Sequence, residues 1–122
     1  MRKLVRPTSF AVATAALATV FPASAAAATP KLVASVGPDY TISLRTTTGA
    51  PVRSAKAGVS TIVVRDRSDE HNFRLVGPGV NKATGVDFMG SATWRVRLLK
   101  GKTYRFVCDP HASHMHGSFR LR

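Results

Sequence analysis

The sequence predicts an all-β fold, a Greek-key β-sandwich or barrel of seven to eight strands, within residues 29–122. Two observations predict it. Short segments in which apolar and polar residues alternate recur along the chain, and turn residues separate them. After residue 28, no long segment repeats apolar residues at helical spacing. We expect a single domain that buries one modest core.

The expected strands follow from the alternation within each segment. Residues 59–65 are rich in β-branched side chains. In the segment 70–76, His71, Phe73 and Leu75 share the face directed at the core, while Asn72 and Arg74 share the other. Altogether, strands are expected at residues 31–36, 40–45, 59–65, 70–76, 92–98, 103–108 and 117–122.

Two segments have no clear alternation. Residues 54–58 form either a short strand or a loop. Residues 80–91 are predicted to form a loop, with or without a helical turn, in which Met89 fills part of the core.

The first 28 residues predict a secretory signal peptide. Arg2, Lys3 and Arg6 precede an apolar run over residues 9–21, and a series of small residues follows with possible cleavage after any alanine from Ala25 to Ala28. Thirteen apolar residues fall short of the roughly 20 needed to cross a bilayer. We therefore expect no transmembrane segment and an exported protein, which is extracellular, attached to the cell surface or periplasmic.

The chain is strongly basic, with 18 Lys and Arg against six Asp and Glu. Removal of the signal would leave a domain of net charge about +9. Many of these cations fall on outward positions of the expected strands, where charge also discourages pairing of sheet edges; they are Arg95, Arg97, Arg105, Arg120 and Arg122. Basic residues do not alternate with aromatic ones in a nucleic-acid-binding pattern, so no nucleic-acid partner is expected.

Residues 104–119 concentrate the possible metal ligands. Cys108 is the only cysteine of the chain, and His111 and Met115 follow closely. Tyr104, Phe106 and Cys108 lie two residues apart, which places the thiol on the apolar face at the end of a strand. Alone, such a cysteine would most often be a buried inert thiol.

His71 is the expected third member of a metal site. Alone it would more often be an ordinary core histidine, but a Greek-key sandwich can bring its strand end close to that of Cys108. One thiolate, two imidazoles and a weak axial thioether suit both oxidation states of copper, so this set of side chains predicts a copper site.

These motifs resemble cupredoxins, most closely the plastocyanin and pseudoazurin branch and its small secreted bacterial relatives. The likeness lies in Cys108-Asp-Pro-His111 with Met115 after an aromatic strand, and in His71-Asn72 upstream; it covers essentially residues 31–122. It implies a type 1 (blue) copper ion held by His71, Cys108 and His111 in the equatorial plane, with Met115 axial. Asn72 would match the residue that ties the two ligand-bearing segments together.

One departure from the family pattern concerns the axial ligand. The methionine lies one residue earlier than in most plastocyanin-like loops, and His116 occupies the usual position. His116 therefore remains the alternative axial ligand, and it would favour a more tetragonal or zinc-tolerant site. His114 has no counterpart in the family, and we expect it to be a solvated loop residue.

The resemblance implies a monomeric carrier of single electrons and not an enzyme. Its partner would be a redox protein, of acidic character if the basic surface guides the encounter. We expect it to dock on an apolar patch formed by Pro110, Ala112 and Met115. Two alternatives remain: a copper-binding protein for storage, delivery or tolerance that uses His114 and His116 as well, and a metal-free basic β-sandwich that binds cell-wall polymers.

Overall fold

The chain folds as an all-β sandwich, which confirms the fold class predicted from the sequence. The computed structural model describes residues 3–5, 8–24, 29 and 31–122. Within these residues the strands are β1 (Lys31–Val36), β2 (Ile42–Thr46), β3 (Gly58–Asp66), β4 (Arg74–Gly77), β5 (Val80–Ala83), β6 (Gly90–Leu98), β7 (Thr103–Val107) and β8 (His116–Arg120). Two short 3-10 helices join them, η1 (Val52–Ser54) and η2 (Asp109–His111).

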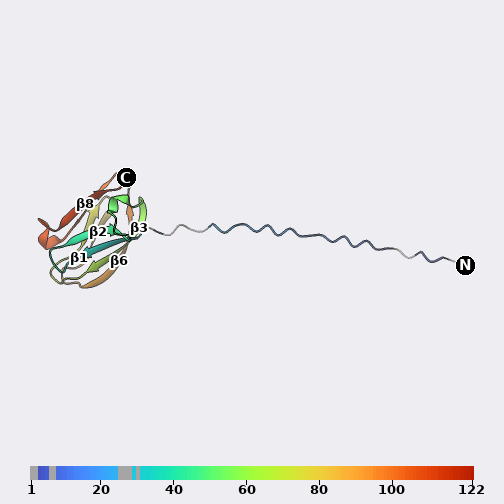
Figure 1. Ribbon diagram of the computed structural model, residues 1–122, viewed down its shortest axis with the longest axis horizontal. Coiled ribbons are helices and arrows are strands. Elements are labelled where there is room, and N and C mark those ends of the chain that lie inside the picture. The colour runs from blue at the N-terminus through green and yellow to red at the C-terminus, as the bar shows by residue number, and fades with distance from the viewer. Residues whose placement is uncertain (1–2, 6–7, 25–28, 30) are drawn as a thin grey trace.

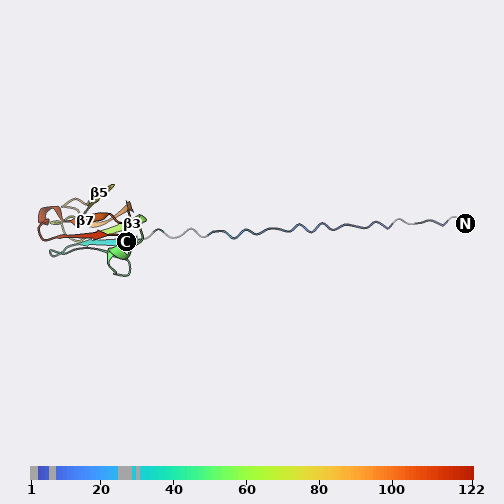
Figure 2. The ribbon, with the colours of Figure 1, turned by 90° about the horizontal axis from the view of Figure 1, so that it is seen from above.

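The strands form two four-stranded sheets, with the orders β2-β1-β3-β6 and β5-β4-β7-β8. β1 pairs with β3 in parallel, and every other pair is antiparallel. The two sheets lie face to face, as the two views of the ribbon show (Figure 1, Figure 2). Alternate side chains of each strand therefore point into the space between the sheets.

That space holds a single hydrophobic core. In β1 the side chains of Leu32, Ala34 and Val36 are buried while their neighbours are more exposed. All members of the core cluster lie between Leu32 and Leu121. Among the described residues, a protein that starts at residue 29 therefore keeps every member of the core cluster.

The described residues before this unit, 3–5 and 8–24, are exposed and contain neither helix nor strand. Within the described part of the chain, no helix has the length and apolar character needed to cross a membrane. The predicted cleavage position, between Ala25 and Ala28, lies outside the described residues. The signal peptide therefore stays a prediction.

The strand directions place four connecting loops at one end of the sandwich. These loops cover residues 37–41, 67–73, 84–89 and 108–115. We call this the distal end, because the N-terminal segment enters β1 at the opposite, proximal end (Figure 1). The proximal end comprises residues 47–57, 78–79, 99–102 and 121–122.

Two predictions about residues 80–91 were wrong. Residues 80–83, predicted as a loop, form β5, which pairs with β4 through a two-residue turn with Gly79 at φ +71°. β5 is an edge strand with only Val80 buried, so its sequence has little alternation to detect. Of residues 54–58, predicted as a short strand or a loop, residues 55–57 form a loop, while Ser54 ends η1 and Gly58 begins β3. Met89 does not fill the core, because its side chain is 59% exposed on a distal loop.

Candidate metal centre

Three side chains from separate parts of the chain converge at the distal end. His71 lies in the loop before β4, Cys108 directly follows β7, and His111 ends η2. The two Nδ1 atoms of the histidines are 3.0 Å apart, and the Cys108 sulfur lies 3.7 Å from His71 Nδ1 and 3.6 Å from His111 Nδ1. His71 and Cys108 are buried, while His111 is half-buried. The sequence had predicted this group of three.

The spacing of these three atoms fits a bound metal ion. A point equidistant from atoms 3.0, 3.6 and 3.7 Å apart lies about 2 Å from each, in or near their plane. That is the bond length expected for imidazole nitrogen and close to that for thiolate sulfur on a transition metal. The donor set of one sulfur and two nitrogens suits copper or zinc. The residues present therefore fit a metal ion, and their chemistry alone does not choose between these two.

Backbone pairing brings the three residues together. Arg74 of β4 pairs with Val107 of β7, so the residues just before β4 lie beside those just after β7. The loop that carries Cys108 is then closed by four backbone hydrogen bonds, two of which involve the Met115 and His114 N–H groups and the His111 carbonyl. The Cys108 N–H donates to the Met115 carbonyl at 3.0 Å, and the His111 N–H donates to the Cys108 carbonyl at 3.1 Å.

Asn72 links the two segments that supply the ligands. Its Oδ1 accepts a hydrogen bond from the Asp109 backbone N–H at 2.7 Å, and its Nδ2 donates to the Asp109 carboxylate at 2.8 Å and to the Thr84 carbonyl at 3.1 Å. The alternation had placed Asn72 on the strand face opposite the core, but its side chain is buried and only 2% exposed. The strand begins at Arg74, so strand alternation does not govern Asn72.

The Asp109 carboxylate is held by a cation as well. Arg74 Nε lies 2.9 Å from its Oδ1, and both side chains are about one third exposed. Hydrogen bonds from Arg74 lower the pKa of Asp109 below its usual value, with a smaller contribution from Asn72. Asn72 and Arg74 thus both hold Asp109, the residue next to Cys108, in place.

A second, buried anchor holds the loop that carries His71. The hydroxyl of Thr84 accepts a hydrogen bond from the Phe73 N–H at 2.9 Å and donates to the Asp66 carboxylate at 3.1 Å. Asp66 also accepts from the Ser68 N–H at 3.2 Å. Burial raises the pKa of Asp66 despite these hydrogen bonds. The sequence analysis missed this anchor, since Thr84 lies in a segment without a recognisable pattern.

The two candidate axial ligands differ in environment. Met115 is fully buried in the core cluster at the end of the ligand loop. His116 is exposed, and its Nδ1 lies 2.8 Å from the Ala112 carbonyl. Within the described residues, the cluster of ligand atoms closer than 4.8 Å to one another contains neither His116 nor His114. Met115 stays the predicted axial ligand.

Tyr40 covers the site from outside, which the sequence analysis did not anticipate. Its ring centroid lies 5.3 Å from that of His71, 5.0 Å from that of His111 and 5.4 Å from that of His114. The ring is 63% exposed. No sequence signal marks it, because it lies in the short turn between β1 and β2.

The predicted docking patch of Pro110, Ala112 and Met115 needs a correction. Met115 has no exposed surface, so it cannot contribute to a patch. Tyr40 lies at the exposed edge of the site instead, beside the half-buried ring of His111.

Comparisons with known proteins add little to this geometry. No protein-family model matches the chain, and no curated protein matches it either. A solved structure of Lac15 from a marine microbial metagenome is similar with a TM-score of 0.43 and 18% sequence identity; the likeness covers 78% of this chain and 32% of Lac15. The chain thus spans about a third of the length of Lac15, and a likeness this distant carries no argument about function.

Proposed function

We propose that this chain is an exported type 1 copper protein of the cupredoxin kind that carries single electrons. One observation carries the proposal: a buried thiol and two imidazole nitrogens lie at the spacing of metal ligands around a common centre. The fully buried Met115 on the same loop supports a weak axial thioether. With this soft thioether added, the ligand set suits both oxidation states of copper, whereas zinc has no redox chemistry, and we therefore assign copper to the proposed carrier.

A copper ion bound here would supply the one-electron chemistry, and the protein would supply a fixed set of ligands. The hydrogen bonds of Asn72 and the Thr84 anchor hold both ligand segments in place. Fixed ligands mean that little has to move when the charge of the site changes. Complete burial of Cys108 keeps water away from the sulfur, which tunes the reduction potential.

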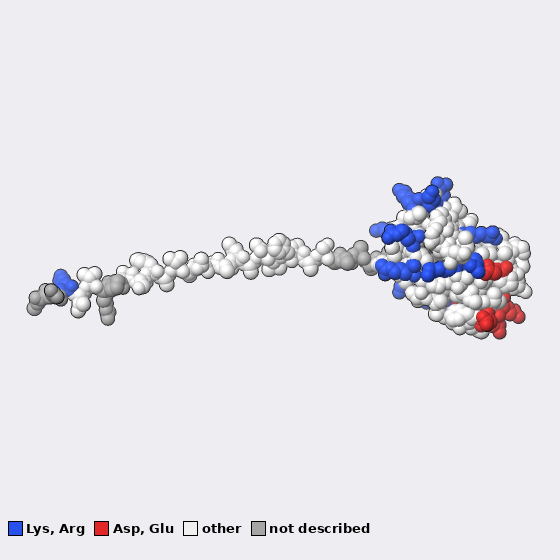
Figure 3. Space-filling model, turned by 180° about the vertical axis from the view of Figure 1, so that it is seen from behind, with Lys and Arg blue, Asp and Glu red and all other residues white. Residues whose placement is uncertain are grey.

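The charges around the site bear on the partner. All six acidic residues of the chain lie in the distal loops or at the strand ends beside them, and the space-filling view shows red side chains at the end furthest from the N-terminal segment (Figure 3). Five of them are exposed: Asp39, Asp69, Glu70, Asp87 and Asp109, of which Asp109 forms the ion pair with Arg74. A redox partner that docks over His111 and Tyr40 would therefore meet acidic side chains. This arrangement favours a basic or neutral partner over the acidic one expected from net charge alone.

Addition of Cu(II) to the reduced protein of residues 29–122 tests the proposal. We expect an intense visible band from thiolate-to-copper charge transfer, lost in Cys108→Ser and weakened in acid, where the ligands become protonated. His114→Ala is the matched control for His111→Ala, and only the latter should disturb the band. A colourless copper complex of the parent protein would refute the blue-copper assignment.

Two further variants test the axial ligand. We expect Met115→Leu to keep a visible band but to change the reduction potential, because the axial ligand tunes it. His116→Ala should leave both unchanged. The reverse pattern would assign the axial position to His116.

A second candidate function is copper storage or delivery with the same ligands. One observation favours it: the exposed ring of His114 lies 5.7 Å from that of His111 between centroids, next to the covering Tyr40. An imidazole at that place could take part in handing an ion to another protein. Fast self-exchange and a reversible couple would support the electron carrier, whereas an irreversible couple with copper transfer to a chelator that slows in His114→Ala would support delivery.

A further inference from the structure

A groove lies on the open side of the sandwich, where the edge strand β2 of one sheet faces the edge strand β8 of the other. Its volume is about 940 Å³. β2 and η1 form one wall, and β7, β8 and the turn between β6 and β7 form the other. None of its lining residues belongs to the metal centre.

Five cationic side chains line this groove, and no acidic one does. They are Arg45, Arg53, Lys100, Arg120 and Arg122. Within the described residues the structure records one salt bridge, between Arg74 and Asp109, so none of the five cations is neutralised by a carboxylate. Like charges gathered without a counter-charge repel one another, and an anion bound among them would relieve that repulsion.

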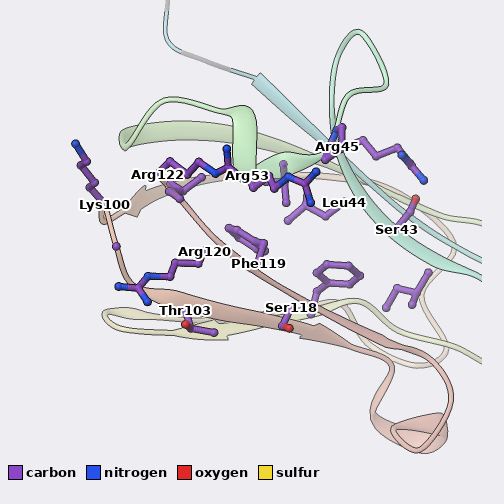
Figure 4. Close-up of a pocket in the computed structure, with 16 residues that line it drawn as sticks. Ser43, Leu44, Arg45, Arg53, Lys100, Thr103, Ser118, Phe119, Arg120 and Arg122 are labelled. Atoms are coloured by element: carbon purple, nitrogen blue, oxygen red, sulfur yellow. The ribbon is translucent and has the colours of Figure 1, made fainter.

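Apolar side chains form part of the groove's lining. Phe106 and Phe119 line the groove together with Ile42, and both Phe106 and Ile42 are partly exposed there. Figure 4 shows Phe119 between the two walls, with Lys100, Arg120 and Arg122 toward one end of the groove, Arg53 on the opposite wall near Phe119 and Arg45 further along. Most of the cations therefore lie at one end of the groove, and the remaining ones lie beside its apolar surface.

We propose that this groove binds a single-chain anionic amphiphile, which has a phosphate or carboxylate head and an alkyl chain. The head would lie among the cations near the proximal end, and the chain would follow the apolar surface past Phe119. The groove is within the size range of pockets for small ligands. An extended polyanion would use the cations but would leave the phenyl rings without a partner.

Charge segregation supports this assignment. In the space-filling view most Lys and Arg side chains lie toward the proximal part of the sandwich, although some reach the acidic side chains at the distal end (Figure 3). An anion approaching the protein is thus attracted to the groove and repelled from the metal end. The proposal stands without the copper site, because it uses none of the metal ligands.

The test measures binding of dodecyl phosphate below its micelle concentration to residues 29–122, by calorimetry and by NMR shifts. We expect one molecule per protein, with the largest shifts at Phe119 and Arg53 and none at Tyr40. Hexyl phosphate should bind more weakly, by up to about fourfold for each methylene removed. Inorganic phosphate alone should bind far more weakly than either.

Two double variants distinguish binding inside the groove from attraction by the net charge of the protein. Arg53→Gln with Arg120→Gln should weaken dodecyl phosphate binding about tenfold or more, since charge-assisted hydrogen bonds to the head are lost. Arg95→Gln with Arg97→Gln removes the same charge from exposed positions of β6 outside the groove. This control should change the affinity for dodecyl phosphate less than about threefold.

Several results would overturn the proposal. Affinity independent of chain length, or equal affinity for inorganic polyphosphate, would assign the groove to polyanions. Equal losses in the two double variants would show that only diffuse charge matters. Adsorption to vesicles with anionic phospholipid, without binding of monomeric dodecyl phosphate, would assign the cations to a membrane surface.

Discussion

Asn72→Ala should lower the stability of the protein substantially even when no metal is present. The Asn72 side chain makes three hydrogen bonds and is 2% exposed. A hydrogen bond contributes about 1 kcal/mol, and the substitution also leaves the Asp109 N–H without its partner. We therefore expect a loss of about 3 kcal/mol, a large part of the 5–15 kcal/mol typical of such a domain.

Urea unfolding of residues 29–122, metal-free and reduced, measures this loss. With an m-value of about 1.5 kcal/mol/M, the midpoint should fall by about 2 M. Asn81→Ala is the matched control, because Asn81 is exposed and accepts one hydrogen bond from Arg74. It should cost less than about 0.5 kcal/mol. A loss below 1 kcal/mol for Asn72→Ala, or one equal to the control, would refute the idea that Asn72 ties the ligand segments together.

Two other substitutions probe the surroundings of the site. Gly117→Ala should lower the free energy of unfolding by about 1–3 kcal/mol, because a Cβ at this position would overlap the ring of Phe106. Ser118→Ala, on the exposed side of the strand, should be nearly neutral in the same urea assay. Arg74→Gln should cost at most about 1 kcal/mol at pH 7, because its ion pair with Asp109 is partly exposed. Since the pair lowers the folded-state pKa of Asp109, its contribution is present above about pH 4 and disappears as the pH falls through that lowered pKa. A difference between parent and variant that stays constant down to pH 2 would contradict this reasoning.

The fold class could be predicted because most strands have one face on the core. Strand alternation is clear in β1 and β3, where buried positions occur at every second residue over much of the strand, and in β6, where less exposed and exposed residues alternate. It failed for β5, whose exposed edge position leaves a single buried side chain. The alternation of His71, Phe73 and Leu75 predicts a strand from residue 70, but the strand begins only at Arg74. His71 and Phe73 are both buried, although the chain there is irregular.

The candidate metal ligands could be predicted because their residue types are rare in this chain. A single cysteine three residues before a histidine, at the end of an apolar strand, limits the choices sharply. The residues that support them are common types, and their roles depend on the tertiary fold. Thr84 and Tyr40 reach the site only because four loops meet at the distal end. No local pattern marks such residues.

The strand directions also place most acidic side chains and the cationic groove at different parts of the molecule. The acidic residues share the distal end with the candidate metal centre, whereas the cationic groove opens between the edge strands β2 and β8 toward the other end. A net positive charge therefore does not describe what a partner meets at His111. An anionic ligand or surface would orient the protein by its groove and leave the metal end free. Under this arrangement, the basic side chains that were expected to attract a redox partner would instead bind the anionic ligand in the groove. The groove and the surface at His111 could then be occupied at the same time.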